Sequence, residues 1–200
     1  MLETLQLYFK TFVHPWDETP DARKISYFEV LGISWALHFI YTFYSVFAVF
    51  LGVKSYEYFA KSEDFTHLIL NSFSFSFQKI GLFVQLATVI MYPFLFHFTY
   101  KFWVFLLNFY TNVFEADEES KQNTPDIINA MFTSNIFLIL PIAGSMISFF
   151  AQIYLLFRGV IKKLHFTKTQ AFLVLMTPFF LLFIATILIV SYFIFLFSLI

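Results

Sequence analysis

The stretch FLVLMTPFFLLFIATILIVSYFIFLFSL, residues 172–199, contains no charged residue. A helix needs about 20 mostly apolar residues to cross the ~30 Å hydrocarbon core of a bilayer, and this stretch is longer than that. The rest of the chain has the same character, because 60% of its 200 residues are hydrophobic and only 12% are charged. Soluble domains carry about 25% charged residues. The sequence therefore predicts an all-α integral membrane protein.

Apolar segments bounded by polar residues predict a bundle of five transmembrane helices in one membrane domain, residues 28–200. The predicted spans are residues 28–53, 80–114, 127–140, 145–160 and 172–199. The second is expected to be one long helix, because a proline such as Pro93 alone usually only kinks a membrane helix. A mixed loop is expected at 54–79, an acidic loop at 115–126 and a tight turn at 141–144.

Residues 1–27 are predicted to form a cytoplasmic segment with a short amphipathic helix lying at the membrane surface. The apolar residues that recur at helical spacing on one face are Leu2, Leu5, Phe9, Phe12 and Val13. A secretory signal is not expected, because Glu3 stands where a basic region would be and no small-residue cleavage site follows. The first span is therefore expected to remain in the mature protein.

Basic residues predict the orientation of the chain in the plasma or inner membrane. Most of the 12 Lys and Arg residues fall on the side that holds the N-terminus, the acidic loop and the loop between spans four and five. The positive-inside rule then places the N-terminus in the cytoplasm and the C-terminus outside. The topology anchor, which is expected to contact anionic lipid headgroups, consists of Arg158, Lys162, Lys163 and Lys168. The acidic and basic loops together are a candidate face for a protein partner, although such charge runs are usually only solvated.

Ionisable residues at membrane depth are functional candidates by default. His38 is expected near the midplane in span one and His97 near the cytoplasmic end of span two, so the two should not share a metal or a proton. Glu29 and Lys101 lie at similar depth, which predicts an ion pair at the inner interface. The alternative is that each side chain reaches the headgroups independently.

Amides and small residues are expected to bring helices together. Gln85 and Gln152 can donate hydrogen bonds across neighbouring spans, and small residues four apart permit close approach of two helices. The two small pairs are Gly32 with Ala36 and Gly144 with Ser148. Gly159 is expected to loosen the end of span four, and Thr167 is a plausible N-cap for span five.

No motif of an enzyme occurs in the sequence. It lacks a nucleophile elbow, a zinc-protease motif, a phosphate-binding loop and any cysteine, so we expect no catalytic residue, no cofactor and no metal. The net charge of −1 makes a nucleic-acid partner unexpected. The lipid bilayer, a protein partner or a second copy of the chain are the expected partners. A small-solute or ion transport component and a structural subunit of a larger complex are the alternatives.

The second half of the chain resembles the YIP (Ypt/Rab-interacting protein) domain family, in its compact bacterial form. The residues that carry the resemblance are Ala130, Pro141, the run Gln152-Ile153-Tyr154-Leu155, Gly159, the run His165-Phe166-Thr167, and Ala171. The N-terminal run Phe12-Val13-His14-Pro15-Trp16 is also similar to that of bacterial members.

The resemblance implies five spans with a cytoplasmic N-terminus and an external C-terminus, and a non-enzymatic role in organising membrane or binding protein partners. Eukaryotic members are linked to Rab GTPases and carry a long N-terminal region with an Asp-Leu-x-Gly-Pro-like motif. This chain has no such motif, so Rab binding is not implied for it. The family offers no catalytic residue to transfer.

Overall fold

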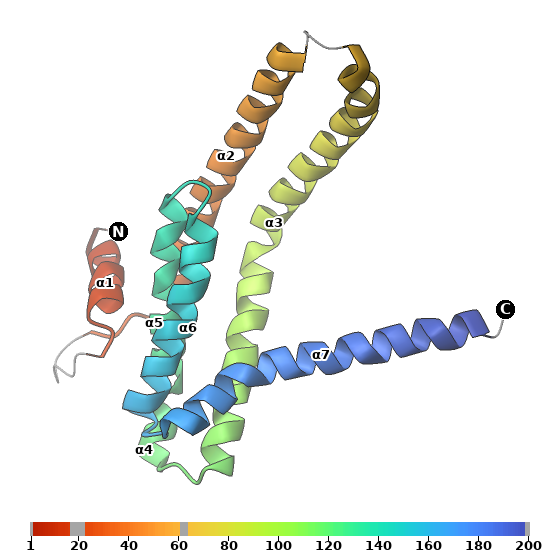
Figure 1. Ribbon diagram of the computed structural model, residues 1–200. Coiled ribbons are helices and arrows are strands. Elements are labelled where there is room, and N and C mark those ends of the chain that lie inside the picture. The colour runs from red at the N-terminus through yellow and green to blue at the C-terminus, as the bar shows by residue number, and fades with distance from the viewer. Residues whose placement is uncertain (1, 17–22, 61–63, 199–200) are drawn as a thin grey trace.

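The computed structural model describes residues 2–16, 23–60 and 64–198, with their side chains except those at 49, 50, 52–79, 82, 119 and 198. This part of the chain is built from helices, as predicted, and has no strand (Figure 1). The elements are α1 (Leu2–Val13), α2 (Tyr27–Ala60), α3 (Asp64–Val113), α4 (Glu118–Gln122), α5 (Thr124–Thr133), the 3₁₀ helix η1 (Ser134–Ile139), α6 (Gly144–Lys163) and α7 (Lys168–Ser198).

Four helices in the described part of the chain contain stretches that are long and apolar enough to cross a membrane. These stretches are Tyr27–Ala48, Phe83–Val113, Gly144–Lys163 and Lys168–Phe197, which correspond to predicted spans one, two, four and five. The predicted span at 127–140 is not among them, because it falls on the 10-residue α5 and the 6-residue η1. A bundle of five spans is therefore not confirmed.

The prediction of a mixed loop at 54–79 was wrong. α2 continues to Ala60 and α3 already begins at Asp64. No glycine or proline occurs between Gly52 and Gly81, so neither of the two strongest helix-breaking residue types opposes helix in the described parts of this stretch. The acidic loop at 115–126 is likewise shorter than predicted, because it contains α4 and the first turn of α5.

Predicted span two is a single helix, as expected, because α3 runs through Pro93 without a break. α3 lies beside α2, and together the two helices reach well beyond the turn that joins η1 to α6 (Figure 1). The two helices therefore form a long hairpin, against one half of which the remaining elements pack.

The segment formed by α5 and η1 is the most enclosed part of the structure, since α2 and α6 pack against both elements and α3 packs against α5. The fully enclosed apolar side chains include Ile127, Ile128 and Met131. A 3₁₀ helix has poorer hydrogen bonds than an α-helix, and irregular backbone is tolerated at membrane depth only when protein surrounds it. Burial of Ser134, Asn135 and Leu138 between α2 and α6 meets that condition for part of η1.

A helix, α1, is present where one was predicted, but one side of it is docked on the bundle, so an amphipathic helix lying at the membrane surface is not confirmed. Tyr8 is fully buried, and its hydroxyl donates a hydrogen bond to the Phe132 carbonyl oxygen at 2.9 Å. Burial raises the pKa of the Tyr8 phenol, so the group stays neutral and remains a donor. The opposite side of α1 exposes Leu2 and Phe9. α1 packs against α5 and α2, and it stands at the outer side of the bundle in Figure 1.

Gly159 has a different role from the one expected. α6 does not loosen there but continues to Lys163, and Gly159 is buried under the indole of Trp16. A Cβ atom at this position would lie 2.4 Å from Trp16 Cη2 and 2.8 Å from Ile127 Cγ2. The glycine therefore makes room for the Trp16 indole and the Ile127 side chain.

Capping boxes begin two of the long helices. The Ser26 and Glu29 side chains bond each other's backbone N–H groups at the start of α2. At the start of α7, the Thr167 N–H donates to Gln170 Oε1 at 2.8 Å and the Gln170 N–H donates to Thr167 Oγ1 at 3.3 Å. The predicted N-cap role of Thr167 is confirmed, because each box satisfies two donors that a helix end leaves unpaired.

Thr167→Ala is expected to lower the free energy of unfolding by about 1 kcal/mol, which is the usual cost of losing an N-cap hydroxyl. Thermal unfolding in detergent measures the effect. Thr169→Ala is the matched control, because Thr169 is exposed in the first turn of α7 and forms no part of the box. Equal stability changes for the two variants would contradict the capping role.

The turn between η1 and α6 carries backbone strain at one residue. Ile142 has a φ of 66°, and the Ala143 N–H bonds to the Pro141 carbonyl oxygen at 2.7 Å. This three-residue turn with positive φ is rare and strained, and a β-branched residue is among the least suited to it. The Ile142 side chain is 84% exposed, so it gains little from packing against other helices.

Ile142→Gly is expected to raise the free energy of unfolding by about 1 kcal/mol. Left-handed backbone costs an L-residue ~1–2 kcal/mol, and glycine removes most of that cost while losing little buried surface. Ile142→Val keeps the β-branch and should leave stability unchanged. Melting curves of both variants in the same detergent check this, and a Gly variant that melts lower than the Val variant would overturn it.

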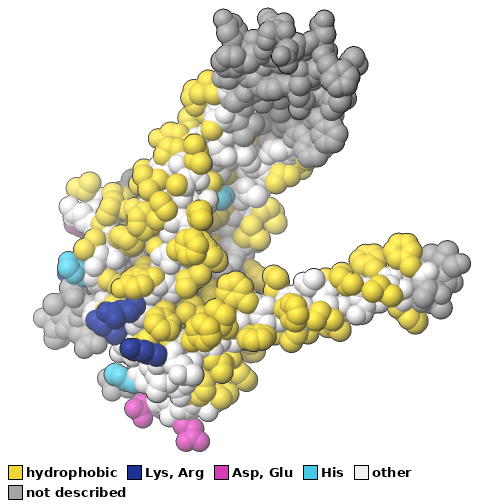
Figure 2. Space-filling view, viewed as in Figure 1, with side chains coloured by type: hydrophobic (Ala, Val, Ile, Leu, Met, Phe, Trp, Pro, Cys, Tyr) yellow, Lys and Arg dark blue, Asp and Glu magenta, His cyan; other side chains and the backbone are white. Residues whose placement is uncertain are grey.

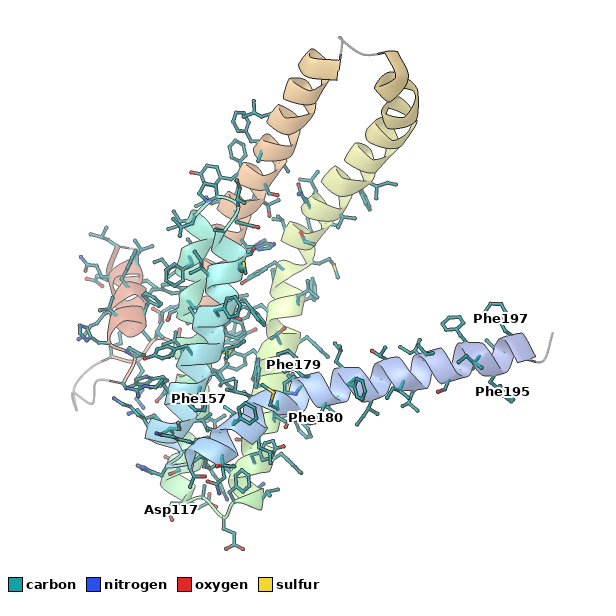
Figure 3. The ribbon with its side chains drawn as sticks, in the orientation of Figure 1. Asp117, Phe157, Phe179, Phe180, Phe195 and Phe197 are labelled. Carbon is teal, nitrogen blue, oxygen red and sulfur yellow. The ribbon has the colours of Figure 1, made fainter. Side chains whose placement is uncertain are left out.

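The last helix, α7, is docked only at its start. Ala171, Val174 and Leu175 are buried, and the Tyr110 hydroxyl bonds Thr177 Oγ1 at 2.6 Å. From Phe179 to Phe197 every described side chain is exposed. Figure 1 shows this part of α7 leaving the bundle, and in Figure 3 Phe195 and Phe197 lie near its far end, away from the other helices.

Candidate functional site

A group of polar side chains inside the bundle meets around Asn135 in η1. Asn135 Oδ1 accepts hydrogen bonds from Ser148 Oγ at 3.1 Å and from Gln152 Nε2 at 2.9 Å. Asn135 Nδ2 donates to the Tyr92 hydroxyl at 3.2 Å. These four residues, together with His38, form what we call the Asn135 cluster. It connects α2, α3, η1 and α6.

His38 extends this cluster through a ring contact. Its imidazole stacks on the Tyr92 ring, with centroids 4.5 Å apart and ring planes 21° from parallel. His38 Nε2 is buried and has no hydrogen-bond partner among the described residues. An unpaired buried polar atom normally costs stability, and such atoms call for an explanation. His38 is therefore the member of the cluster with unused hydrogen-bonding capacity.

The sequence had indicated His38 and Gln152 as candidates but had not indicated Asn135 or Tyr92. Asn135 lies in an apolar run, where a single amide gives little signal of its own. One usable signal was that Asn135 falls inside a predicted span, as Gln85 and Gln152 do, because intramembrane amides bond across helices. Ser148 had been singled out only as a small packing residue.

The prediction that Gln85 bonds across helices is confirmed by a second polar contact between α2 and α3. Gln85 Nε2 donates to Ser45 Oγ at 3.0 Å. Gln85 and Tyr92 are seven residues apart on α3, as are Ser45 and His38 on α2, which is two helical turns in each case. The two polar contacts therefore lie on the same side of the hairpin, about 10 Å apart along it.

The predicted Glu29–Lys101 ion pair is not formed. The Glu29 carboxylate pairs with Arg23 and accepts hydrogen bonds from the Ser26 N–H and hydroxyl groups, both at 2.9 Å. Its place in the capping box of α2 directs it toward the preceding segment, while Lys101 lies exposed on α3. An ion pair that the sequence did not predict joins Lys24 to Asp126 on α5.

His97 lies at the beginning of the α2–α3 hairpin, away from His38. The Tyr27 hydroxyl and His97 Nδ1 are hydrogen-bonded at 2.9 Å, which places His97 beside the first residue of α2. His38 is ~16 Å further along that helix. The structure therefore keeps the two histidines apart, as predicted. In the described part of the chain, no three His, Asp or Glu side chains come together as a metal site.

The predicted anchor residues lie where α6 ends and α7 begins. Arg158, Lys162 and Lys168 are exposed, whereas Lys163 is half-buried. Lys and Arg side chains gather near that end of the molecule, with Asp and Glu beyond them (Figure 2). α6 ends at Lys163, and the left-handed backbone of His165, with a φ of 57°, turns the chain toward α7.

Comparison with known proteins does not show a family for this chain. No family model matches the chain, and neither the curated proteins nor the solved structures contain a match to it. The resemblance to the YIP domain family rests on the residues quoted above alone.

Proposed function

We propose that this chain is a non-enzymatic integral membrane protein, with the layout of the YIP domain family, that organises membrane or binds protein partners within the bilayer. The observation that carries the proposal is α7. It offers a stretch of 30 residues that is long and apolar enough to cross a membrane, with none of its most apolar part buried in the chain. A surface of this kind calls for lipid or a second protein as its cover.

Five spans, a cytoplasmic N-terminus and an external C-terminus are the arrangement that fits this role in a plasma or inner membrane. α5 and η1 together extend for about 27 Å, close to the ~30 Å of hydrocarbon. For α7 to be the fifth span, its exposed part has to turn until it is roughly parallel to the other spans. Pro178 lies between the docked and the exposed parts, and a proline weakens a helix at that point.

A photo-crosslinking residue at Ile187 tests the binding of partners. Ile187 is exposed on the free part of α7, whereas Val174 is buried on its docked part. In native membranes, the residue at 187 should give crosslinks to another protein or a second copy, and the residue at 174 should crosslink only within the chain. Lipid adducts alone at 187 would refute partner binding through α7.

A small-solute or ion transport component is the second candidate, and the unpaired His38 Nε2 inside the bundle favours it. Polar groups at membrane depth commonly line substrate or proton pathways. Purified protein in liposomes should carry a proton or ion flux if this candidate is right, and His38→Ala should abolish it. His97→Ala is the matched control, since His97 lies outside the Asn135 cluster. Absence of any flux leaves the non-enzymatic role as the proposal.

A further inference from the structure

We propose that one exposed row of α6 is a binding site for an anionic phospholipid of the surrounding bilayer. The inference rests on the proposed membrane location and deepens it by assigning the lipid class. Exposed side chains follow one another at steps of four residues along the helix: Met146, Phe150, Tyr154, Arg158 and Lys162. Residues four apart are neighbours on a helix surface.

The chemistry of this row changes in the order that a phospholipid requires. Met146 and Phe150 are apolar and are 64% and 57% exposed, which suits an acyl chain. Tyr154, 60% exposed, adds a hydroxyl donor at the next step, and tyrosine is enriched where lipid meets water. From Met146 to Arg158 the helix rises ~18 Å, slightly more than half of the ~30 Å hydrocarbon core.

The charged end of the row is suited to a phosphodiester. Arg158 presents a fork of N–H donors that matches phosphate geometry, and Lys162 lies one turn further along, ~6 Å away. Lys168 begins α7 and is exposed at the same end of the bundle. Among the described residues, no acidic side chain forms an ion pair with any of these three.

Acidic groups near this end are either engaged elsewhere or lie further from the apolar surface. Asp126 pairs with Lys24, and Glu118 pairs with Lys121. Asp117 points away from the helices at the tip beside α4 (Figure 3). Along the surface toward the end where α6 meets α7, apolar side chains therefore come first, then basic ones, then acidic ones (Figure 2). This order favours an anionic phospholipid, whose headgroup would lie beside the basic residues, over an acidic protein. An acidic protein would carry no acyl chain for Met146 and Phe150.

Quenching of Trp16 fluorescence tests the proposal, because the Trp16 indole packs over Gly159 next to Arg158. The protein, with Trp35→Phe and Trp103→Phe, is placed in phosphatidylcholine vesicles that contain brominated phosphatidylglycerol or brominated phosphatidylcholine. The phosphatidylglycerol should be preferred. Arg158→Gln with Lys162→Gln should lower that preference about thirtyfold, which is the combined attraction of two basic residues to anionic lipid. Lys10→Gln with Lys101→Gln, which removes the same charge elsewhere, should leave it unchanged.

Raising the salt concentration provides a second measurement that needs no substitution at the site. At 1 M salt the screening length falls to about 3 Å, so the preference for phosphatidylglycerol should weaken. An unchanged preference in Arg158→Gln with Lys162→Gln would overturn the proposal, as would equal loss in the control variant. Competition by free glycerol phosphate at equal concentration would also overturn it, in favour of a soluble phosphate ligand. Release of the wild-type protein from vesicles by alkaline carbonate would instead refute the membrane location itself.

Discussion

Gly144→Ala is expected to lower the free energy of unfolding by about 3 kcal/mol, at the upper end of the usual cost of overpacking. A Cβ atom at Gly144 would lie 2.3 Å from the Phe137 carbonyl oxygen and 3.2 Å from Leu138 Cα. Both contacts are with backbone rather than with a flexible side chain. The turn that would have to shift is fixed by the bond from the Gly144 N–H to the Leu140 carbonyl oxygen at 3.2 Å.

Titration with sodium dodecyl sulphate in mixed micelles measures the change in stability. Gly32→Ala is the matched control, because a Cβ atom at Gly32 would meet nothing within 4 Å. Alanine is the better helix former by about 1 kcal/mol, so the control should be neutral or slightly stabilising. A Gly144→Ala variant that is as stable as Gly32→Ala would contradict the prediction and show that the backbone of the turn yields to the added methyl group.

These two glycines also show how far the sequence could predict packing. Both belong to small pairs four residues apart, and both pairs were expected to bring helices together. Gly144 and Ser148 are buried between η1 and α6, which agrees with the prediction. Gly32 and Ala36 are exposed, so that pair does not pack within the chain. A small-residue pattern permits close approach but does not specify a neighbour.

The long apolar helices were predictable, because about 20 apolar residues in a row have few alternatives to a helix. Their ends were predictable where proline or glycine stands, as at the turn that begins with Pro141. The stretch 54–79 was read as a loop on its polarity alone, yet polar residues such as Lys and Glu are good helix formers. Hydropathy could not predict that other helices enclose segment 127–140, because it does not distinguish a buried helix from one that faces lipid.

The sequence indicated only some residues of the Asn135 cluster, for a different reason. His38 and Gln152 stood out because each is polar inside an apolar run. The place where they meet depends on how η1 packs between α2 and α6, and no local sequence pattern predicts that packing. Glu29 was predicted to pair with Lys101 because the two residues lie at similar depth. Ser26, three residues before Glu29, forms a capping box with it instead. Local capping chemistry was the stronger evidence at that position.

Asn135→Leu is expected to lower the free energy of unfolding by about 3 kcal/mol. The amide makes three hydrogen bonds, to Tyr92, Ser148 and Gln152, and a hydrogen bond between membrane helices is worth about 1 kcal/mol. Leucine has the same number of side-chain heavy atoms, branched at the same carbon, but offers neither donor nor acceptor. Gln152 Nε2 would retain only the weak contact to Ser148 Oγ at 3.5 Å.

A double-mutant cycle separates the lost bonds from any disturbance of packing. Gln152→Leu alone should cost about 1 kcal/mol, because its main partner is Asn135. With Asn135→Leu already present, the same change should cost little or nothing, since the Gln152 amide has no bond to Asn135 left to lose. The resulting coupling energy should be at least about 1 kcal/mol, which is typical of residues in one hydrogen-bond network. Asn108→Leu, on an exposed position of α3, is the control and should be near neutral. Additive losses at 135 and 152 would mean that the two amides stabilise the bundle independently, and that the cluster does not act as one unit.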